Sequence, residues 1–331
     1  MSSASVAHEY PIRSFLEEEV NLDIMSHLSR GLSFGEVAEK VGKSHSFVQS
    51  KCNFLRNHGI MLFGRWNVDV NALDMVKTIH FHGYNEKSLN VIFEWNFFLS
   101  YLSQIKMGEA KYLAMYTFPN EIKDRIGSEE ITSWYFTFPH FEVPFHKDLP
   151  LEEEFFKLYE EEDNDDPLPP RGEKIKDPDL VDIYICRFAQ QEVEEIDLTE
   201  FTIRIEEEIG DIVDVSYDGV KDKFQNLKEK HVIYPIIPFD FTELSFVSIY
   251  FITYFKEIFR VMKTLNRFNI LTGISFMEEN KNLVFVQCPY NKQNEVIQIF
   301  DNLDEKNKMF FVTKTYVNRG FPYRYYLEKF K

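Results

Sequence analysis

The sequence has little of what secreted, zinc-bound or membrane-spanning proteins need. Its three cysteines, Cys52, Cys186 and Cys288, lie far apart in the chain. Isolated cysteines build neither a disulfide framework nor a paired zinc spacing, so they favour a reduced, cytoplasmic setting. The longest apolar run, near Phe246–Phe255, is interrupted by Ser and Thr and is too short to span a bilayer. The first ten residues lack the apolar core of a signal peptide.

The sequence also lacks the motifs of common enzymes. It has no Gly-rich phosphate loop, no nucleophile elbow and no Cys/His pair with a partner. His80 and His82 share one face of an expected strand, but no third metal ligand accompanies them at a recognisable spacing. Ordinary strand histidines are the favoured interpretation. The sequence therefore predicts no enzyme, no catalytic residue, no metal site and no cofactor.

Acidic residues outnumber basic ones, and the formal net charge is -17. Most of this charge lies between Leu151 and Asp211, where 22 acidic residues face 6 basic ones. By contrast, Arg30–Trp66 carries six Lys and Arg against two Glu, a local charge of +4. The bulk charge argues against a nucleic-acid partner, but that argument does not apply to this basic stretch.

Within the basic stretch, Gly42–Ile60 predicts a helix with both ends encoded. Ser44 suits the N-cap and Gly59 the residue that ends the helix. One side carries an apolar stripe, and the other carries uncharged hydrogen-bonding side chains flanked by cations, which suit base edges and phosphates. The residues expected to contact double-stranded DNA are Lys43, Ser44, His45, Ser46, Gln49, Ser50, Lys51, Asn53, Arg56 and Arg65.

Two helices are expected before this one, over 14–29 and from a capping box at Ser33–Glu36 to Val41. After it, Ile60–Val68 predicts two short strands turned at Gly64-Arg65, which would form a wing. Three helices and a hairpin predict a winged helix-turn-helix. A small helical domain used only for packing is the alternative.

The next segment predicts a ferredoxin-like α/β domain. The expected elements are strands over Thr78–Tyr84, Lys111–Phe118 and Ile131–Phe138, the last continued by Phe141–Phe145, with helices over Glu86–Ile105 and Asn120–Ile126. An acidic, Pro-containing segment over Leu151–Asp179 then predicts extended, solvated chain. It would serve as a spacer, or as a DNA-mimicking tail that masks the basic helix.

The second half repeats the first. A shift of 172 residues places Val48, Leu55 and Ile60 over Val220, Leu227 and Val232. Leu198–Gly210 would match the second helix and Val232–Phe239 the wing. The remaining expected elements follow the order βαββαβ plus an edge strand: Leu244–Thr253, Tyr254–Leu265, Asn269–Phe276, Leu283–Pro289, Asn291–Leu303, Met309–Val317 and Tyr323–Phe330. Because the outward positions of the second copy carry Asp218, Asp222 and Glu229, it is expected to have lost DNA contact.

The expected fold class is α+β, a tandem repeat of a winged helix-turn-helix followed by a ferredoxin-like βαββαβ domain. The expected domains are a DNA-reading winged helix at 1–75, an α/β domain at 76–148, an acidic linker at 149–190, an acidic winged helix at 191–240 and a second α/β domain at 241–331. A duplicated unit explains these patterns better than unrelated pieces do.

This organisation resembles the Lrp/AsnC (feast/famine) transcription regulators of bacteria and archaea. Gly42–Val48 and Leu55–Ile60 look like that family's capped recognition helix. The resemblance implies that Ser46, Gln49, Ser50 and Asn53 face the major groove, while the α/β domains assemble the protein. No ligand-binding residue is carried over, because the family's glycine-bearing turn has no clear equivalent. The duplication departs from the family, and it implies that one chain makes internally the pairing of two subunits.

The leading hypothesis is therefore a sequence-specific DNA-binding transcription regulator, cytoplasmic and nucleoid-associated, which acts as a homodimer. The alternative is an adaptor of the transcription machinery or a DNA-mimicking factor that acts through the acidic half. A small-molecule effector is left unidentified.

Overall fold

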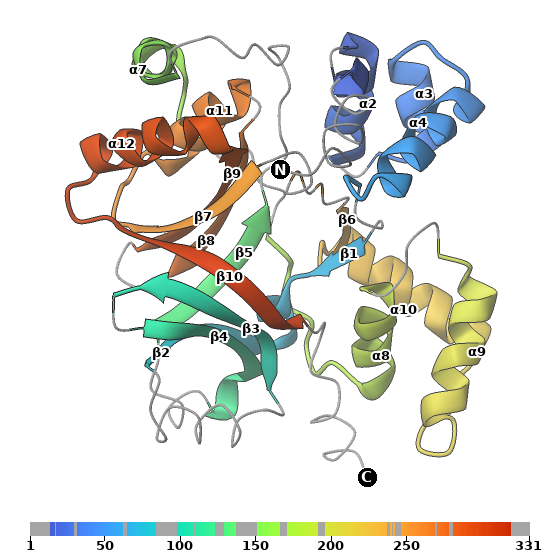
Figure 1. Ribbon diagram of the computed structural model, residues 1–331. Helices are drawn as coiled ribbons and strands as arrows, with labels where there is room; N and C mark the ends of the chain where they lie inside the picture. Colours follow the sequence, from blue (N-terminus) through green and yellow to red (C-terminus); the bar gives the residue numbers. More distant parts are fainter. Residues whose placement is uncertain are drawn as a thin grey trace.

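Figure 1 shows the chain as a computed structural model. The structure describes residues 14–16, 18–29, 32–61, 65–83, 98–108, 110–122, 129–136, 151–165, 171–190, 196–236, 239, 241, 246–268, 270–277 and 281–318. All structural statements below concern these residues.

The three N-terminal helices form as the sequence predicts. They are α2 (Glu19–Ser29), α3 (Phe34–Lys40) and α4 (His45–Asn57). Ser33 and Glu36 form the expected capping box, and the Ser44 side chain caps α4. Gly59 has a φ of +69°, a left-handed conformation that glycine adopts without strain. Val48, Cys52 and Leu55 are fully buried against α2 and α3, so the apolar stripe of α4 is confirmed.

The predicted wing is wrong in the part described. β1 (Arg65–Val68) pairs antiparallel with β6 (Ile233–Ile236) from the other half of the chain, and Met61 forms a bridge with Phe239. The Trp66 ring packs edge-on against Phe224, 5.5 Å away between ring centres, and the Asn67 side-chain amide donates to the Tyr234 hydroxyl. The strand thus finds its partner and its packing across the chain, not in a local hairpin.

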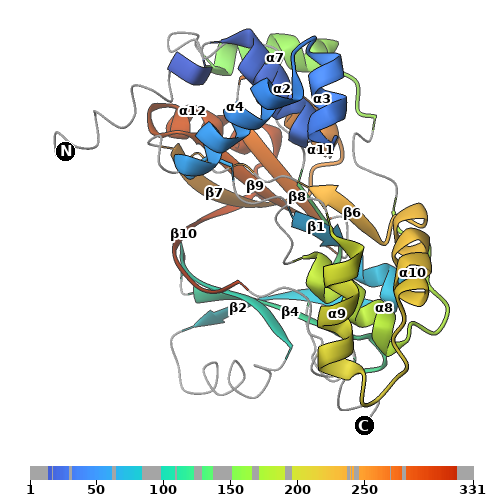
Figure 2. The ribbon, with the colours of Figure 1, turned by 90° about the vertical axis from the view of Figure 1, so that its right-hand side faces the viewer.

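A second helical group comprises α8 (Leu180–Ala189), α9 (Leu198–Ile209) and α10 (Tyr217–Glu229). Val220, Phe224 and Leu227 are buried in α10, as the repeat predicts. Within the predicted linker region, α8 is instead an almost fully buried helix of this group. The two groups lie on either side of the β1–β6 ladder (Figures 1 and 2).

Eight antiparallel strands form a closed barrel in the order β10-β3-β4-β2-β5-β8-β9-β7. Their bounds are β2 Met75–Gly83, β3 Leu99–Met107, β4 Ala110–Pro119, β5 Glu129–Phe136, β7 Phe246–Thr253, β8 Leu271–Met277, β9 Asn282–Pro289 and β10 Lys308–Asn318. The β3–β10 and β5–β8 ladders join strands from the two halves of the chain. Interior side chains of both halves meet in one cluster that contains Ile79, Tyr250 and Phe310.

Helices α7 (Leu151–Glu161), α11 (Ile258–Arg267) and α12 (Gln293–Leu303) lie outside the second half of the barrel (Figure 1). The expectation that 151–179 is extended, solvated chain is wrong for α7. Leu151 and Phe155 are buried with residues of α11 and α12, because their spacing of four places both on one helix face. Composition alone hid this amphipathic helix.

Two further predictions fail in the first half. The helix expected over Glu86–Ile105 is wrong from Leu99 onward, where β3 pairs with β4 through a turn at Gly108 (φ +51°) and with β10. The helix expected over Asn120–Ile126 is a short 3-10 turn at Asn120–Ile122 in the part described. The strands expected at 141–145 and 323–330 lie outside the described residues.

The fold class is therefore α+β, with a curled antiparallel sheet and packed helices. Short 3-10 turns at Val70–Leu73 (η1) and Tyr290–Lys292 (η5) complete the connections described. Among the helices that the structure describes, none is long and apolar enough to cross a membrane.

Candidate functional site

Strand β2 places two different sets of side chains on its two faces, because successive residues of a strand point to opposite sides. Ile79 and Phe81 point into the barrel, where Phe81 packs edge-on against Phe310 at 5.5 Å. Thr78, His80 and His82 occupy the opposite, outer face. In β4 that face continues with Tyr116, which is opposite Thr78 in the β2–β4 register.

The two histidines and the tyrosine form one compact group. The imidazole rings of His80 and His82 are parallel within 4°, and their centres are 5.7 Å apart. The Tyr116 ring meets His80 nearly at right angles at 5.0 Å. His80 Nε2 is also 3.2 Å from the Thr78 hydroxyl, so Thr78 and Tyr116 together fix the orientation of this imidazole.

Burial sets the protonation of all three rings. It lowers the pKa of His80 to about 4, with a smaller contribution from the neighbouring His82. Burial likewise lowers the pKa of His82 and raises the pKa of the Tyr116 phenol. At neutral pH this face therefore presents two uncharged imidazoles and one protonated phenol.

Two polar atoms of this group have no hydrogen-bond partner in the part of the chain that the structure describes. They are His82 Nε2 and the Tyr116 hydroxyl, on side chains that are 7% and 1% exposed. Buried polar atoms are nearly always paired, so an unpaired neighbouring couple indicates a place where a further molecule supplies the partner. The matching outer face of the second half is apolar, with Ile249, Phe251, Val284 and Val286 packed under helices.

The barrel side of the same strand holds one more perturbed group. Burial lowers the pKa of Lys77 to about 8, because the charged ammonium group is less favourable inside the protein than in water. The period of the strand places Lys77 on the side of Ile79, across the sheet from the histidines.

Two of the cations expected to contact DNA make contacts within the N-terminal helical group. Lys51 Nζ is 3.0 Å from Glu18 Oε2 and lies 5.2 Å from the centre of the Phe15 ring. Its hydrogen bond and charge lower the pKa of Glu18. The Arg56 guanidinium lies over the Phe34 ring at 5.7 Å. Both side chains therefore hold helices together instead of facing outward as free cations.

The other expected DNA contacts remain on the surface or act as caps. Ser44 Oγ accepts from Phe47 N at 3.2 Å and lies 3.0 Å from Ser46 Oγ. The exposed ones are Lys43, His45, Ser46, Gln49, Ser50 and Asn53. The Arg65 backbone pairs with Ile236 in the β1–β6 ladder. This arrangement does not itself test their contact with DNA, which stays a sequence-based prediction.

The sequence placed His80 and His82 on one strand face but favoured ordinary strand histidines, and it did not single out Thr78, Tyr116 or Lys77. The signal for Tyr116 was the alternation of β4, which becomes informative only once its register against β2 is known. Among the described residues, no group of three or more His, Cys, Asp or Glu side chains is placed to hold a metal ion.

Comparison with known proteins gives a likeness in structure. A solved structure of the siroheme decarboxylase NirDL in co-complex with an iron-uroporphyrin III analogue has a TM-score of 0.50 and 11% sequence identity, and the match covers 94% of this chain and 97% of that chain. Another structure of the siroheme decarboxylase NirDL has a TM-score of 0.48 and 12% identity, with 93% and 97% covered. No protein-family model and no curated protein matches the chain.

This likeness corrects the sequence-based interpretation. The prediction of an Lrp/AsnC-like, DNA-binding transcription regulator is wrong, as are its adaptor alternative and the expectation that the chain is not an enzyme, because the solved protein with this arrangement is a decarboxylase. Nucleoid association loses its basis with the regulator. At 11% identity the likeness shows the fold alone: over nearly its whole length, the chain has the fold of a siroheme decarboxylase.

Proposed function

We propose that the chain binds an iron-containing tetrapyrrole at the outer face of β2 and β4 and removes carboxyl groups from it. The observation that carries the proposal is the unpaired, buried Nε2 of His82 beside the unpaired Tyr116 hydroxyl. The shared fold with a siroheme decarboxylase solved with an iron-uroporphyrin III analogue supports the substrate class.

The two histidines suit an iron ion that is already coordinated by a tetrapyrrole. Two histidines alone make a poor site for a free metal ion, which usually takes three or four protein ligands. Iron in a tetrapyrrole is already held by four ring nitrogens and takes only axial ligands, commonly a neutral imidazole. His82, neutral because burial lowers its pKa, offers such a nitrogen, while His80 is held by Thr78.

Tyr116 is placed to donate the proton that decarboxylation requires. When a carboxylate leaves as carbon dioxide, the electron pair of the broken C–C bond stays on the remaining carbon, which must then take up one proton. Tyr116 is protonated at neutral pH, as phenols are, and its hydroxyl lies on the same face as the two imidazoles. We assign Tyr116 as the proton donor and His82 as the group that contacts the iron.

Binding is tested by titrating the chain with iron-uroporphyrin III and following the Soret absorption band. The wild-type chain should shift the band, His82→Ala should abolish the axial-ligand shift, and the exposed His45→Ala should leave it unchanged. Tyr116→Phe should bind normally but lose most of the carbon dioxide release, scored by mass spectrometry of the tetrapyrrole. Equal shifts of the Soret band in the wild type and in His82→Ala would contradict the assignment of His82 as the group that contacts the iron.

We also propose that the chain is a tandem of two like units, each a three-helix group followed by four barrel strands. The order of the described elements on each side of residue 150 supports this, as do the left-handed residues at corresponding positions, Gly59 (φ +69°) and His231 (φ +54°). We keep the predicted boundaries, except that α8 is assigned to the second helical group. A homodimer remains a prediction, tested by light scattering.

A further inference from the structure

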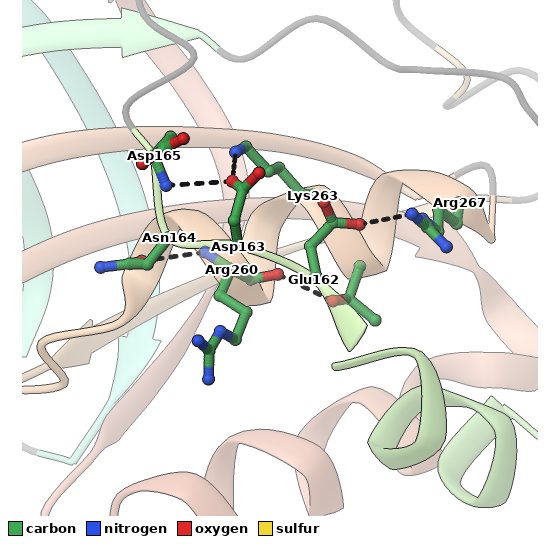
Figure 3. A network of polar contacts seen from close by, with 8 residues as sticks. Glu162, Asp163, Asn164, Asp165, Arg260, Lys263 and Arg267 are labelled. Atoms are coloured by element: carbon green, nitrogen blue, oxygen red, sulfur yellow. Dashed lines mark hydrogen bonds and ion pairs between the residues drawn. The ribbon is translucent and has the colours of Figure 1, made fainter. Parts of the chain in front are cut away.

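The acidic segment that follows α7 lies along a row of cations on α11. Arg260, Lys263 and Arg267 are spaced at i, i+3 and i+7, so they share one helix face. Glu162 Oε2 is 2.8 Å from an Arg267 nitrogen, and Asp163 is ion-paired with Lys263. Figure 3 shows these pairs and the side chain of Asn164 next to the start of α11. The segment therefore runs antiparallel to α11: each successive residue from Glu162 to Asn164 contacts a residue of α11 that lies closer to the N-terminus of that helix.

The same segment completes the N-terminus of α11. Glu257, the residue before α11, makes no side-chain capping hydrogen bond, whereas Asn164 Oδ1 accepts from Arg260 N at 3.1 Å. Asp163 Oδ1 also accepts from Asp165 N at 3.1 Å, which holds the segment in a tight turn. We call residues 162–165 the latch. Two of its carboxylates pair with cations of α11, and the side-chain amide oxygen of Asn164 accepts from the first turn of the helix.

Only charge and hydrogen bonds hold the latch, in contrast to α7. Leu151 and Phe155 anchor α7 in the apolar core, but Asp163, Asn164 and Asp165 are exposed. The Glu162 side chain is more enclosed, 14% exposed in its pair with Arg267. Exposed ion pairs such as Asp163–Lys263 are weak and are screened by salt, while apolar burial is not. Residues 163–165 can therefore separate from α11 without unfolding α7, whereas Glu162 is also tied to α7 because its N–H donates to Leu158 O at 3.1 Å.

We propose that the face of α11 formed by Lys263, Arg267 and the backbone N–H of Arg260 is a binding site for a small ligand with two or more carboxylates, which the latch occupies within the same chain. The Arg260 guanidinium is itself paired with Glu257 at 3.0 Å. The carboxylates of Glu162 and Asp163 stand where those of the ligand would bind. A ligand of this kind displaces the latch and frees the first turn of α11. The site lies on the other half of the chain from the histidine face and does not depend on the tetrapyrrole proposal.

Neutralising the latch tests the site, with citrate as the probe. The variant Glu162→Gln/Asp163→Asn should bind citrate at least tenfold more tightly than the wild type by calorimetry, and adding Lys263→Gln should remove the gain. Glu160→Gln/Glu161→Gln is the matched control, since it removes the same charge from exposed acids that make no ion pair in the described structure. Equal affinity in all variants would overturn the proposal.

Hydrogen exchange of the wild-type chain gives a second readout that needs no substitution. Citrate should speed exchange of the Arg260 amide, whose acceptor is Asn164, while the amides of α7 stay protected. Sulfate at equal ionic strength is the control anion, and it should act only weakly. If sulfate sped exchange of the Arg260 amide as much as citrate did, the effect would be screening of the ion pairs by salt, and the face would not be a specific site for carboxylates.

Discussion

His80 makes the stability of the protein sensitive to acid. Its pKa is lowered to about 4 in the folded chain, against about 6.5 in an unfolded one. Between these values the unfolded chain binds a proton that the folded chain does not, so the free energy of unfolding should fall as pH drops from about 6.5 to about 4. Below about 4 both states are protonated and this loss levels off. The shift corresponds to about 3 kcal/mol.

The measurement is the urea unfolding midpoint across this pH window for the wild type and for His80→Asn. The carboxylates of the chain titrate in both proteins, so the difference between the two curves isolates His80. We expect the variant to lose much less stability between pH 6.5 and 4. Parallel curves would contradict the role given to burial of this ring.

Lys223 neutralises two carboxylates in the second helical group, of which Asp182 is buried and Asp179 is half exposed. Its Nζ is 2.8 Å from Asp179 and 3.2 Å from Asp182, whose side chain is 7% exposed. Burial and the neighbouring Asp179 raise the pKa of Asp182, so this carboxylate depends on the cation. Lys223→Met should therefore destabilise the chain by about 3 kcal/mol in thermal unfolding. Adding Asp182→Asn should recover part of that loss, and the exposed Lys221→Met should have little effect.

At the scale of elements, the segment after the latch connects the two halves. Gly172 N donates to Asp69 Oδ2 at 2.9 Å, and Ile175 N donates to Ala72 O at 2.8 Å. A methyl group on Gly172 would lie 3.0 Å from the Ala72 methyl and 3.1 Å from His231 O, which is too close for ordinary contact. Gly172→Ala should therefore cost about 1–3 kcal/mol of stability, seen as a lower melting temperature.

A matched control for this substitution is Gly35→Ala in α3. The added methyl there meets only Ser33 Oγ, at 3.9 Å. Alanine is favoured over glycine inside a helix by roughly 0.5–1 kcal/mol, so this variant should melt slightly higher. If both variants melted alike, close packing around Gly172 would not be the cause.

Elements with local signals were predictable from the sequence, and elements with distant partners were not. Ser33, Ser44 and Gly59 mark helix ends through bonds to residues three or four positions away, and all three act as expected. β1 carries no sign that its partner is β6, more than 160 residues further along the chain. The aromatic residues before β3 favoured one long helix, because the sequence does not show that β10 borders this strand.

The candidate site was predictable only in part. His80 and His82 were correctly placed on one strand face, since alternation is a local property. Whether they form a site depends on how deeply they are buried and on the neighbouring Tyr116. The sequence does not show that Tyr116 is a neighbour, because this follows from the β2–β4 register. On α4, the sequence does not show that Lys51 pairs with Glu18 or that Arg56 covers Phe34, because these partners lie on other segments of the chain.

For the whole molecule, closure of the barrel decides whether either half can exist alone. The β3–β10 and β5–β8 ladders both cross between the halves, and so does the β1–β6 ladder. The interior cluster also mixes the halves, since Ile79 and Leu113 pack with Tyr250 and Phe310. Each half alone would expose two unpaired strand edges and one side of this apolar cluster, a combination that promotes aggregation.

We therefore expect residues 1–150 and 151–331, produced separately, to be insoluble or to aggregate, also because the core of each helical group contains residues of the other half. Produced together, they should form a one-to-one complex that elutes like the intact chain in size-exclusion chromatography, because all three crossing ladders can form without a covalent link. Charged substitution of interior Phe310, which is fully buried, should prevent this association, whereas the same change at the exposed Met309 should not. A soluble, monomeric, cooperatively folding single half would show that the barrel is not the unit of stability.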